Sequence, residues 1–146
     1  MNTLQETKRW FETAIPNPSP EMLNVQLGVH FEEIAEMCCT IRGTTVQTDN
    51  LIRDLFSAAT RLANHLKKEG GAVVIVDRVE FLDSIEDQIV TATGSGHMAH
   101  MDVVGGLAEV NSSNFSKFED GAPVFDAHGK ITKGANYVRA NLNKFV

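Results

Sequence analysis

Two groups of acidic residues in this sequence are spaced so that each would fall on one face of a helix. Glu33 and Glu36 are three residues apart, and Glu80, Asp83 and Asp87 follow one another at intervals of three and four. Like charges at these spacings repel, so either solvent or a divalent cation must compensate them. Carboxylate oxygens from two helices are ligands that Mg²⁺ accepts, together with waters and substrate phosphates. The acids therefore predict either two solvated helix faces or one magnesium site.

The elements that carry these acids are predicted to be helices. Apolar residues recur at helical spacing along most of the chain, and Ser19-Pro20, Asp77 and Asp102 have the features of helix starts. The predicted helices cover residues 3–14, 20–41, a third segment that begins at Thr48 or Asp49 and ends near Lys68, a fourth that begins at Asp77, and 102–118. Residues 72–76 form a β-branched run that is too short for a helix and is expected to be an extended link. The fold class is thus all-α, a bundle of four to five helices.

Size and charge restrict the function classes. The chain has 146 residues, which suits a single domain spanning 1–146. Its formal charge of −6 argues against a nucleic-acid-binding surface, because such surfaces concentrate Lys and Arg on one face. No apolar run is long enough to cross a bilayer, and the first residues lack the apolar stretch of a signal peptide. We expect a cytoplasmic protein that binds neither nucleic acid nor membrane.

The only cysteines, Cys38 and Cys39, are adjacent. Neighbouring residues on a helix point about 100° apart, so these two thiols are poorly placed to form a disulfide with each other. We expect two buried free thiols.

The segment 119–146 is expected to be an irregular tail. It is rich in Gly, Asp, Asn and Lys, which favour turns. Val124-Phe125 could pair with Lys130-Ile131-Thr132 across a turn at 126–129, which would make a small β-hairpin.

Several motifs occur in an order that resembles a known family. They are the pair Glu33 and Glu36, the later acidic pair ending at Asp87, and then the stretches EVNSSNFSKF (109–118), DGAPVF (120–125), GKI (129–131) and KGANY (133–137). This order is similar to that of the MazG-like and dimeric dUTPase-like all-α nucleotide pyrophosphohydrolases, a family that includes phosphoribosyl-ATP pyrophosphohydrolase. The resemblance covers most of the chain from about residue 20 onward.

The resemblance implies Mg²⁺-dependent cleavage of a nucleoside triphosphate to the monophosphate and pyrophosphate, with Mn²⁺ as an alternative ion. It implies four metal ligands, Glu33, Glu36, Asp83 and Asp87. Many relatives carry Glu three residues before Asp87, where this chain has Ser84, so Asp83 is assigned as the ligand. Whether Glu80 or Ser84 replaces the usual family ligand at this place stays open. Glu32 or Glu33 would orient or deprotonate the attacking water.

The tail motifs of the family imply the substrate contacts. Lys117 and Lys133 would meet phosphate charge, and the amides of Asn111, Asn114 and Asn136 suit a base edge or a sugar hydroxyl. Tyr137 would stack on the base or close the core. The family also implies a homo-oligomer, either a homodimer or a dimer of dimers.

Three other interpretations stay open. Phosphoribosyl-ATP is an alternative substrate within the same family. A di-iron carboxylate bundle would also use inward-facing acids, but it needs Glu-x-x-His pairs, and neither Glu33, Glu36 nor Glu80 is followed by His at that spacing. A non-catalytic helical interaction module would leave all the acids facing solvent.

Overall fold

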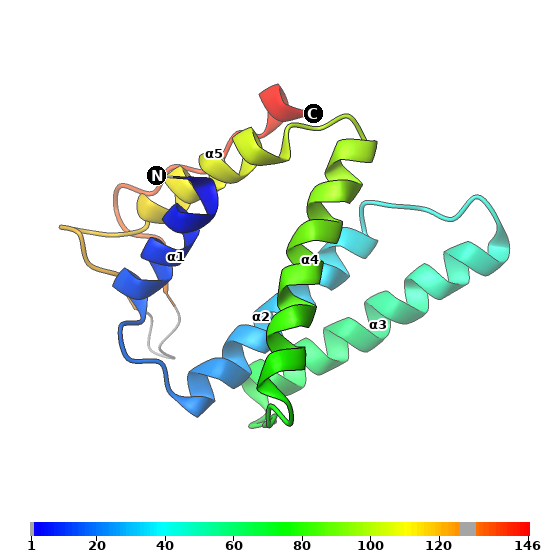
Figure 1. The fold of residues 1–146 in the computed structure, drawn as a ribbon, viewed down its shortest axis with the longest axis horizontal. Helices are drawn as coiled ribbons and strands as arrows, with labels where there is room; N and C mark the ends of the chain where they lie inside the picture. Colours follow the sequence, from blue (N-terminus) through cyan, green and yellow to red (C-terminus); the bar gives the residue numbers. More distant parts are fainter. Residues whose placement is uncertain (1, 126–130) are drawn as a thin grey trace. The chain divides into compact units, whose positions relative to one another are not determined.

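The computed structural model describes residues 2–125 and 131–146, and its secondary structure is helical. The helices are α1 (Thr3–Ala14), α2 (Pro20–Cys38), α3 (Val46–Lys68), α4 (Arg78–Met98), α5 (Val103–Phe115) and the 3₁₀-helix η1 (Asn143–Phe145) (Figure 1). The predicted all-α class and the number of helices are confirmed for this part of the chain. None of the helices described is long and apolar enough to span a membrane.

Three of the predicted helix starts are confirmed, and one is wrong. The side chains of Ser19, Asp77 and Asp102 each accept a hydrogen bond from a backbone N–H in the first turn of α2, α4 and α5. Helix α3 begins at Val46, earlier than expected, because the Thr45 hydroxyl accepts the Thr48 N–H at 3.1 Å. Thr48 therefore lies in the first turn and is not the cap.

Two predicted helix ends lie too far along the chain. Helix α5 ends at Phe115 instead of residue 118, since Lys117 and Phe118 N–H groups bond three residues back, as in a tight turn. Helix α2 ends at Cys38 instead of residue 41 for the same reason, with the Thr40 N–H bonded to the carbonyl of Met37. At α3 the predicted stop is confirmed, because Gly70 follows the helix with φ 74°.

The chain divides into two compact units, Met1–Pro16 with Asp77–Val146, and Asn17–Val76. Each is described here by itself, and the expected single domain over 1–146 stays a prediction. The second unit is a hairpin of α2 and α3 (Figure 1). Its buried residues are mostly small, which lets the two helices approach closely: Gly28, Ala35, Cys38, Ala59, Ala63 and Leu66. The Val73 N–H bonds to Asn24 Oδ1 at 3.0 Å and ties the extended link after α3 back to α2.

The first unit is organised around α5, which contacts α1, α4 and η1. Trp10 of α1 donates its indole N–H to the Asn114 carbonyl at 2.9 Å and stacks on Phe118 at 5.7 Å between ring centroids. The ring of Phe115 meets Phe118 edge-on. This aromatic cluster fixes α1 against the C-terminal end of α5.

The tail does not form the predicted hairpin strands among the described residues. Its pairing is limited to two isolated antiparallel bridges, Glu119 with Ala122 and Phe125 with Ile131. The Thr132 N–H also donates to the Val124 carbonyl at 2.8 Å. The predicted turn at 126–129 and Lys130 lie outside the described residues. A single bridge supplies too few ladder bonds to make a strand.

Candidate functional site

The acidic segment of α2 contains two exposed carboxylates and one that is partly buried. Glu33 and Glu36 are exposed and lie on neighbouring positions of the helix surface. Glu32 is partly buried, with 40% of its side chain exposed, and its Oε1 lies 2.5 Å from Lys67 Nζ of α3. The three neighbouring acids therefore differ in their surroundings. Glu33 and Glu36 are accessible to a ligand from solvent, whereas Glu32 takes part in holding the helical hairpin together.

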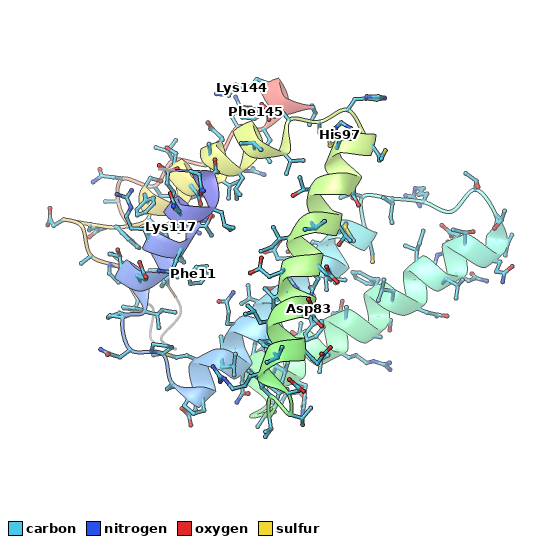
Figure 2. The ribbon with its side chains drawn as sticks, in the orientation of Figure 1. Phe11, Asp83, His97, Lys117, Lys144 and Phe145 are labelled. Atoms are coloured by element: carbon cyan, nitrogen blue, oxygen red, sulfur yellow. The ribbon has the colours of Figure 1, made fainter. Side chains whose placement is uncertain are left out.

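The second group of acids lies on α4. Asp83 and Asp87 are exposed, and Asp83 lies in the N-terminal third of the helix (Figure 2). Glu80, at the first turn, shares their side of the helix, while the Ser84 carbonyl accepts the Gln88 side-chain amide at 3.0 Å. The helical spacing expected from the sequence is present. No carboxyl group of α4 is withdrawn from solvent.

The four predicted metal ligands belong to the two units, with Glu33 and Glu36 in one and Asp83 and Asp87 in the other. Within the described residues, no three His, Cys, Asp or Glu side chains are grouped so as to hold a metal ion. Each pair by itself offers two exposed carboxylates. Protein Mg²⁺ sites often use one or two carboxylates together with waters and phosphate oxygens. Their joint role as ligands stays a prediction.

Asn111 has surroundings that differ from those expected of a substrate contact. Its side chain is buried, with 3% exposed. Its Nδ2 donates to the Thr3 carbonyl at 2.8 Å, and its Oδ1 accepts from the Thr7 hydroxyl at 2.9 Å. Both ends of the amide thus bind α1. We assign Asn111 a structural role and leave it out of the substrate-binding set, because its amide is withdrawn from solvent and bonded to α1 at both ends.

Asn114 and Lys117 form a polar group at the C-terminal end of α5. Lys117 Nζ donates to Asn114 Oδ1 at 2.7 Å and lies 5.9 Å from the Trp10 ring centroid (Figure 2). Both side chains are half-buried. The contact with Asn114 orients the ammonium group, and an oriented cation is suited to meeting an anionic ligand.

The second tail motif docks beside this group. The Gly134 N–H donates to the Lys117 carbonyl at 3.2 Å, and the Ala135 N–H donates to Glu119 Oε1 at 2.6 Å. A side chain at Gly134 would meet Glu119 Cγ and the Lys117 carbonyl at 2.8 Å, so only glycine fits this approach. The backbone contact therefore brings the segment that carries Lys133 to the end of α5.

The remaining predicted residues of this motif differ in exposure. Lys133 Nζ lies 4.8 Å from the ring centroid of Tyr137, a cation–π contact, and Tyr137 is half-buried. Asn136 is exposed. Asn114, Lys117, Lys133 and Tyr137 thus belong to the same unit, and their role as substrate contacts stays a prediction.

Glu109, from the first tail motif, has a structural position that was not expected. Its Oε1 accepts the Asn141 N–H at 3.0 Å, and its Oε2 lies 3.6 Å from Lys144 Nζ. The Asn141 hydrogen bond lowers the pKa of Glu109, partial burial opposes this, and Lys144 lowers it further. Lys144 and Phe145 lie beside the N-terminal end of α5 (Figure 2), where the Phe145 carbonyl accepts the Asp102 N–H at 2.8 Å. Glu109 therefore holds the end of the chain on α5.

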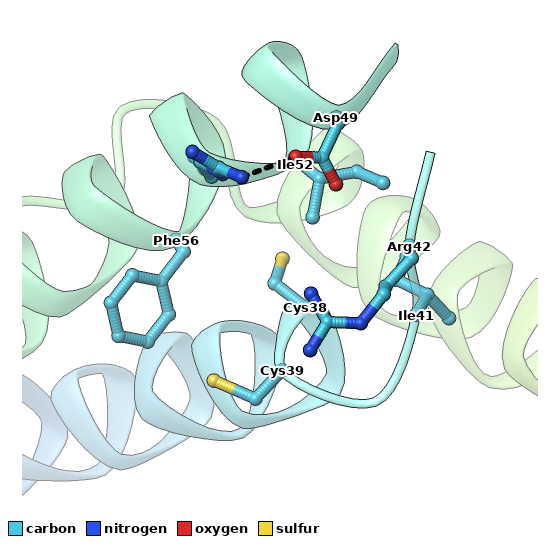
Figure 3. A pocket seen from close by; sticks show the side chains of 8 residues that line it. Cys38, Cys39, Ile41, Arg42, Asp49, Ile52 and Phe56 are labelled. Carbon is cyan, nitrogen blue, oxygen red and sulfur yellow. Dashed lines mark ion pairs between the residues drawn. The ribbon is translucent and has the colours of Figure 1, made fainter. Parts of the chain in front are cut away.

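A pocket that sequence reasoning missed lies where α2 turns into α3 (Figure 3). It has a volume of about 260 Å³ and is lined by Cys38, Cys39, Ile41, Arg42, Asp49, Ile52, Arg53 and Phe56. Arg53 pairs with Asp49 at 2.6 Å across one turn of α3. None of the predicted site residues lines this pocket, and no motif signalled it because its residues come from both sides of a loop.

The same region corrects the expectation for the cysteines. Cys38 is buried and free, as expected, but Cys39 is free and exposed. Their sulfur atoms point in different directions (Figure 3), because Cys39 keeps helical dihedral angles and adjacent positions on a helix point about 100° apart.

Comparison with known proteins adds no relative. The chain matches no protein-family profile, no curated protein and no solved structure.

Proposed function

We propose that this protein is an Mg²⁺-dependent nucleoside triphosphate pyrophosphohydrolase. The observation that carries the proposal is the exposure of Glu33 and Glu36, which lie three residues apart on the surface of α2. Two exposed carboxylates at this spacing are a ligand set that a hydrated divalent cation accepts. The order of motifs resembling the MazG-like and dUTPase-like family supports the same activity.

The reaction transfers the α-phosphoryl group to water. The water oxygen forms a bond to the α-phosphorus, and the bond from that phosphorus to the oxygen bridging the α and β phosphates breaks. The products are the nucleoside monophosphate and pyrophosphate, and the proton lost by the water passes to a general base. We assign the base role to Glu33 in preference to Glu32, because Glu33 is exposed to solvent whereas Glu32 is partly buried.

The metal ligands of the proposal are Glu33 and Glu36 with Asp83 and Asp87. When bound, Mg²⁺ supplies neutralisation of the triphosphate charge and polarisation of the phosphorus under attack. The carboxylates hold the ion, while Lys117 and Lys133 meet the remaining phosphate charge. Asn114 orients Lys117, and Tyr137 with Asn136 would contact the base or sugar.

We also propose that the protein works as a homodimer or a dimer of dimers. Helix α4 has no buried residue, although Val79, Leu82 and Val90 are apolar and exposed. Apolar side chains gathered on one helix are typical of surfaces that associate. A second copy would cover them and help to enclose a nucleotide.

The test is release of pyrophosphate from a panel of nucleoside triphosphates, with phosphoribosyl-ATP included as the alternative substrate. We expect Mg²⁺-dependent release from at least one compound. Replacing a general base costs about 10²- to 10⁴-fold in rate, so Glu33→Gln should lower kcat by that factor. Glu36→Gln should raise the Mg²⁺ concentration needed for half-maximal activity.

The matched control is Asp54→Asn, which removes an exposed acid of α3 outside the proposed site and should leave the activity unchanged. Release that survives Glu33→Gln and Glu36→Gln would contradict the mechanism. Absence of release from every compound would favour the non-catalytic interaction module.

Ultraviolet–visible absorption of protein purified without added metal distinguishes the di-iron alternative from the proposed magnesium site, since an oxo-bridged iron centre absorbs and a magnesium site does not.

A further inference from the structure

The pocket between the end of α2 and the start of α3 combines apolar and charged side chains. Its volume is about 260 Å³, and all of its lining residues belong to the α2–α3 unit. Ile41 and Phe56 line it, with 48% and 40% of their surfaces exposed. Apolar side chains that stay exposed in a concavity gain free energy when a ligand covers them. The pocket is therefore a candidate ligand site.

The loop that carries Arg42 is fixed against α3 by its backbone. The Gly43 N–H donates to Asp49 Oδ1 at 3.4 Å. A Cβ atom at Gly43 would lie 2.7 Å from the Asp49 Cα and 2.7 Å from the Thr48 carbonyl carbon, so glycine is needed for this close approach. Arg42 directly precedes this contact, and its backbone is thereby held at the edge of the pocket.

The charges that line the pocket leave one guanidinium without an acid. Asp49 Oδ2 lies 2.6 Å from Arg53 Nη2, and the other oxygen of Asp49 accepts from Gly43. The Arg42 side chain makes no ion pair within the part of the chain that the structure describes. Two arginines and one aspartate give the lining a formal charge of +1. A ligand with one negative charge would neutralise it.

The charged and apolar parts of the lining lie at different ends of the pocket. Figure 3 shows the Arg42 guanidinium directed toward the end of α2, beside Cys38, and the Phe56 ring on the other side of the two cysteines. A guanidinium binds a carboxylate through two parallel hydrogen bonds. An exposed phenyl ring packs against an apolar or aromatic group. The arrangement thus suits a ligand with a charged end and an apolar end.

The volume and the charge restrict the ligand further. A cavity of about 150 Å³ is large enough for benzene, whereas drug-sized ligands occupy pockets of about 300–1,000 Å³. The ligand is therefore small, with room for one ring and a carboxylate. A phosphate monoester carries about −1.5 to −2 charges at neutral pH, which exceeds the charge of the lining. Asp49 would repel the excess.

We infer that this pocket binds a small organic carboxylate with an apolar or aromatic body. Arg42 binds the carboxylate, while Ile41, Ile52 and Phe56 cover the body of the ligand. This site is independent of the proposed hydrolase activity, because none of the proposed hydrolase residues lines it.

The test uses Cys39, the exposed free thiol of the lining, as a reporter. Uncharged iodoacetamide alkylates it when the thiolate sulfur displaces iodide, and mass spectrometry follows the rate; buried Cys38 should react slowly. Phenylacetate is the probe and should slow this alkylation saturably, with half-protection at about millimolar concentration. Acetate lacks the apolar body and benzyl alcohol lacks the charge, so each should protect less at the same concentration.

Variants of Arg42 test the charged end of the site. Arg42→Gln should raise the phenylacetate concentration for half-protection by about twofold to fivefold and leave the effect of benzyl alcohol unchanged. Arg42→Lys keeps the charge without the two parallel hydrogen bonds, so its affinity should lie between the two. The half-protecting concentration does not depend on the intrinsic reactivity of Cys39. Far-ultraviolet circular dichroism shows that each variant folds.

Arg61→Gln is the matched control, because it makes the same change at an exposed arginine of α3 that does not line the pocket. It should leave phenylacetate protection unchanged. Nuclear magnetic resonance of the Arg42 side-chain N–H gives a second readout without the thiol, since its signal should shift as phenylacetate is added.

Three results would overturn the inference while leaving the proposed hydrolase activity untouched. One is that phenylacetate affects neither the alkylation of Cys39 nor the Arg42 signal. Another is that Arg42→Gln and Arg61→Gln change the half-protecting concentration equally. The third is tighter binding of phenyl phosphate than of phenylacetate, which would replace the carboxylate by a phosphate ester. Saturable protection that needs both the carboxylate and Arg42 supports the inference.

Discussion

Asn111 and Asn114 are one turn apart on α5, yet their amides have different tasks. Asn111 is buried and uses both ends of its amide to bind Thr3 and Thr7 of α1. Asn114 is half-buried, and its Oδ1 accepts from Lys117 at the end of the helix. Residue type and motif were the same for both, so only the neighbouring side chains separate a structural amide from a candidate ligand contact.

Asn111→Ala should therefore lower stability and not substrate affinity. The substitution removes the hydrogen bonds that the buried amide makes to the Thr3 carbonyl and the Thr7 hydroxyl, which costs about 1–3 kcal/mol in the free energy of unfolding. Urea denaturation followed by circular dichroism measures this loss. The KM of the folded variant should stay close to that of the parent protein.

Asn114→Ala is the matched comparison on the same helix. It removes the group that orients Lys117, so we expect KM for the triphosphate to rise and stability to change less than in Asn111→Ala. A rise in KM for Asn111→Ala with unchanged stability would contradict the structural role and return Asn111 to the substrate-binding set.

At the scale of elements, η1 is held on α5 by contacts that include the Glu109 carboxylate. Glu109 accepts the Asn141 N–H and lies near Lys144, while the Phe145 carbonyl accepts the Asp102 N–H. Gly105 allows this approach, because a Cβ atom there would lie 2.6 Å from the Phe145 ring. Most of these bonds join α5 to a segment more than 30 residues later, so they form only in the folded chain.

The docking of η1 should depend on pH through Glu109. The pKa of this carboxyl is lowered from its ordinary value of 4.5, first by the Asn141 hydrogen bond. A lowered pKa in the folded state means that the carboxylate stabilises the docked segment above pH 4.5, and that this contribution is lost as the pH falls through the folded-state pKa. As the pH falls below 4.5, amide hydrogen exchange of Asn141 and Phe145 should become faster than the intrinsic pH dependence of exchange predicts.

Glu109→Gln is the control for this pH dependence. It keeps an oxygen acceptor for the Asn141 N–H and removes the titration, so the protection of Asn141 should no longer vary with acidity. Equal pH dependence in the parent protein and in Glu109→Gln would show that another group controls the segment.

At the scale of the whole molecule, α4 is the place to test the proposed homo-oligomer. Val90 has 66% of its surface exposed on a helix that carries no buried residue. Val90→Glu places a charge on this apolar side, and a charge removed from water inside an interface without a partner is strongly unfavourable. We expect the variant to be monomeric by light scattering coupled to size-exclusion chromatography, under conditions where the parent protein is a dimer.

The activity of that variant adds a second readout. If the second copy helps to enclose the nucleotide, Val90→Glu should lose pyrophosphate release along with the dimer. Arg78→Glu, an exposed change at the start of the same helix, is the control for added negative charge. A parent protein that is monomeric at all concentrations would contradict the proposed homo-oligomer.

The sequence by itself determined the helices and most of their ends. Periodic apolar residues predicted all the α-helices, and the caps at Ser19, Asp77 and Asp102 were read correctly. These features depend on residues within one turn of each other, so the local chain contains the information they need. The start of α3 was misplaced because Thr45 and Thr48 are equally good caps, and the choice between them was not visible in the pattern.

The tertiary structure decided which of the predicted site residues are accessible. The sequence placed Glu32, Glu33 and Glu36 in one acidic segment, but only the packing of α3 on α2 paired Glu32 with Lys67. In the same way, only the packing of α1 on α5 buried Asn111 and left Asn114 with Lys117. A helix pattern specifies the direction of a side chain relative to its own axis. Its partner lies on another element far along the chain, and that element is positioned only when the helices pack.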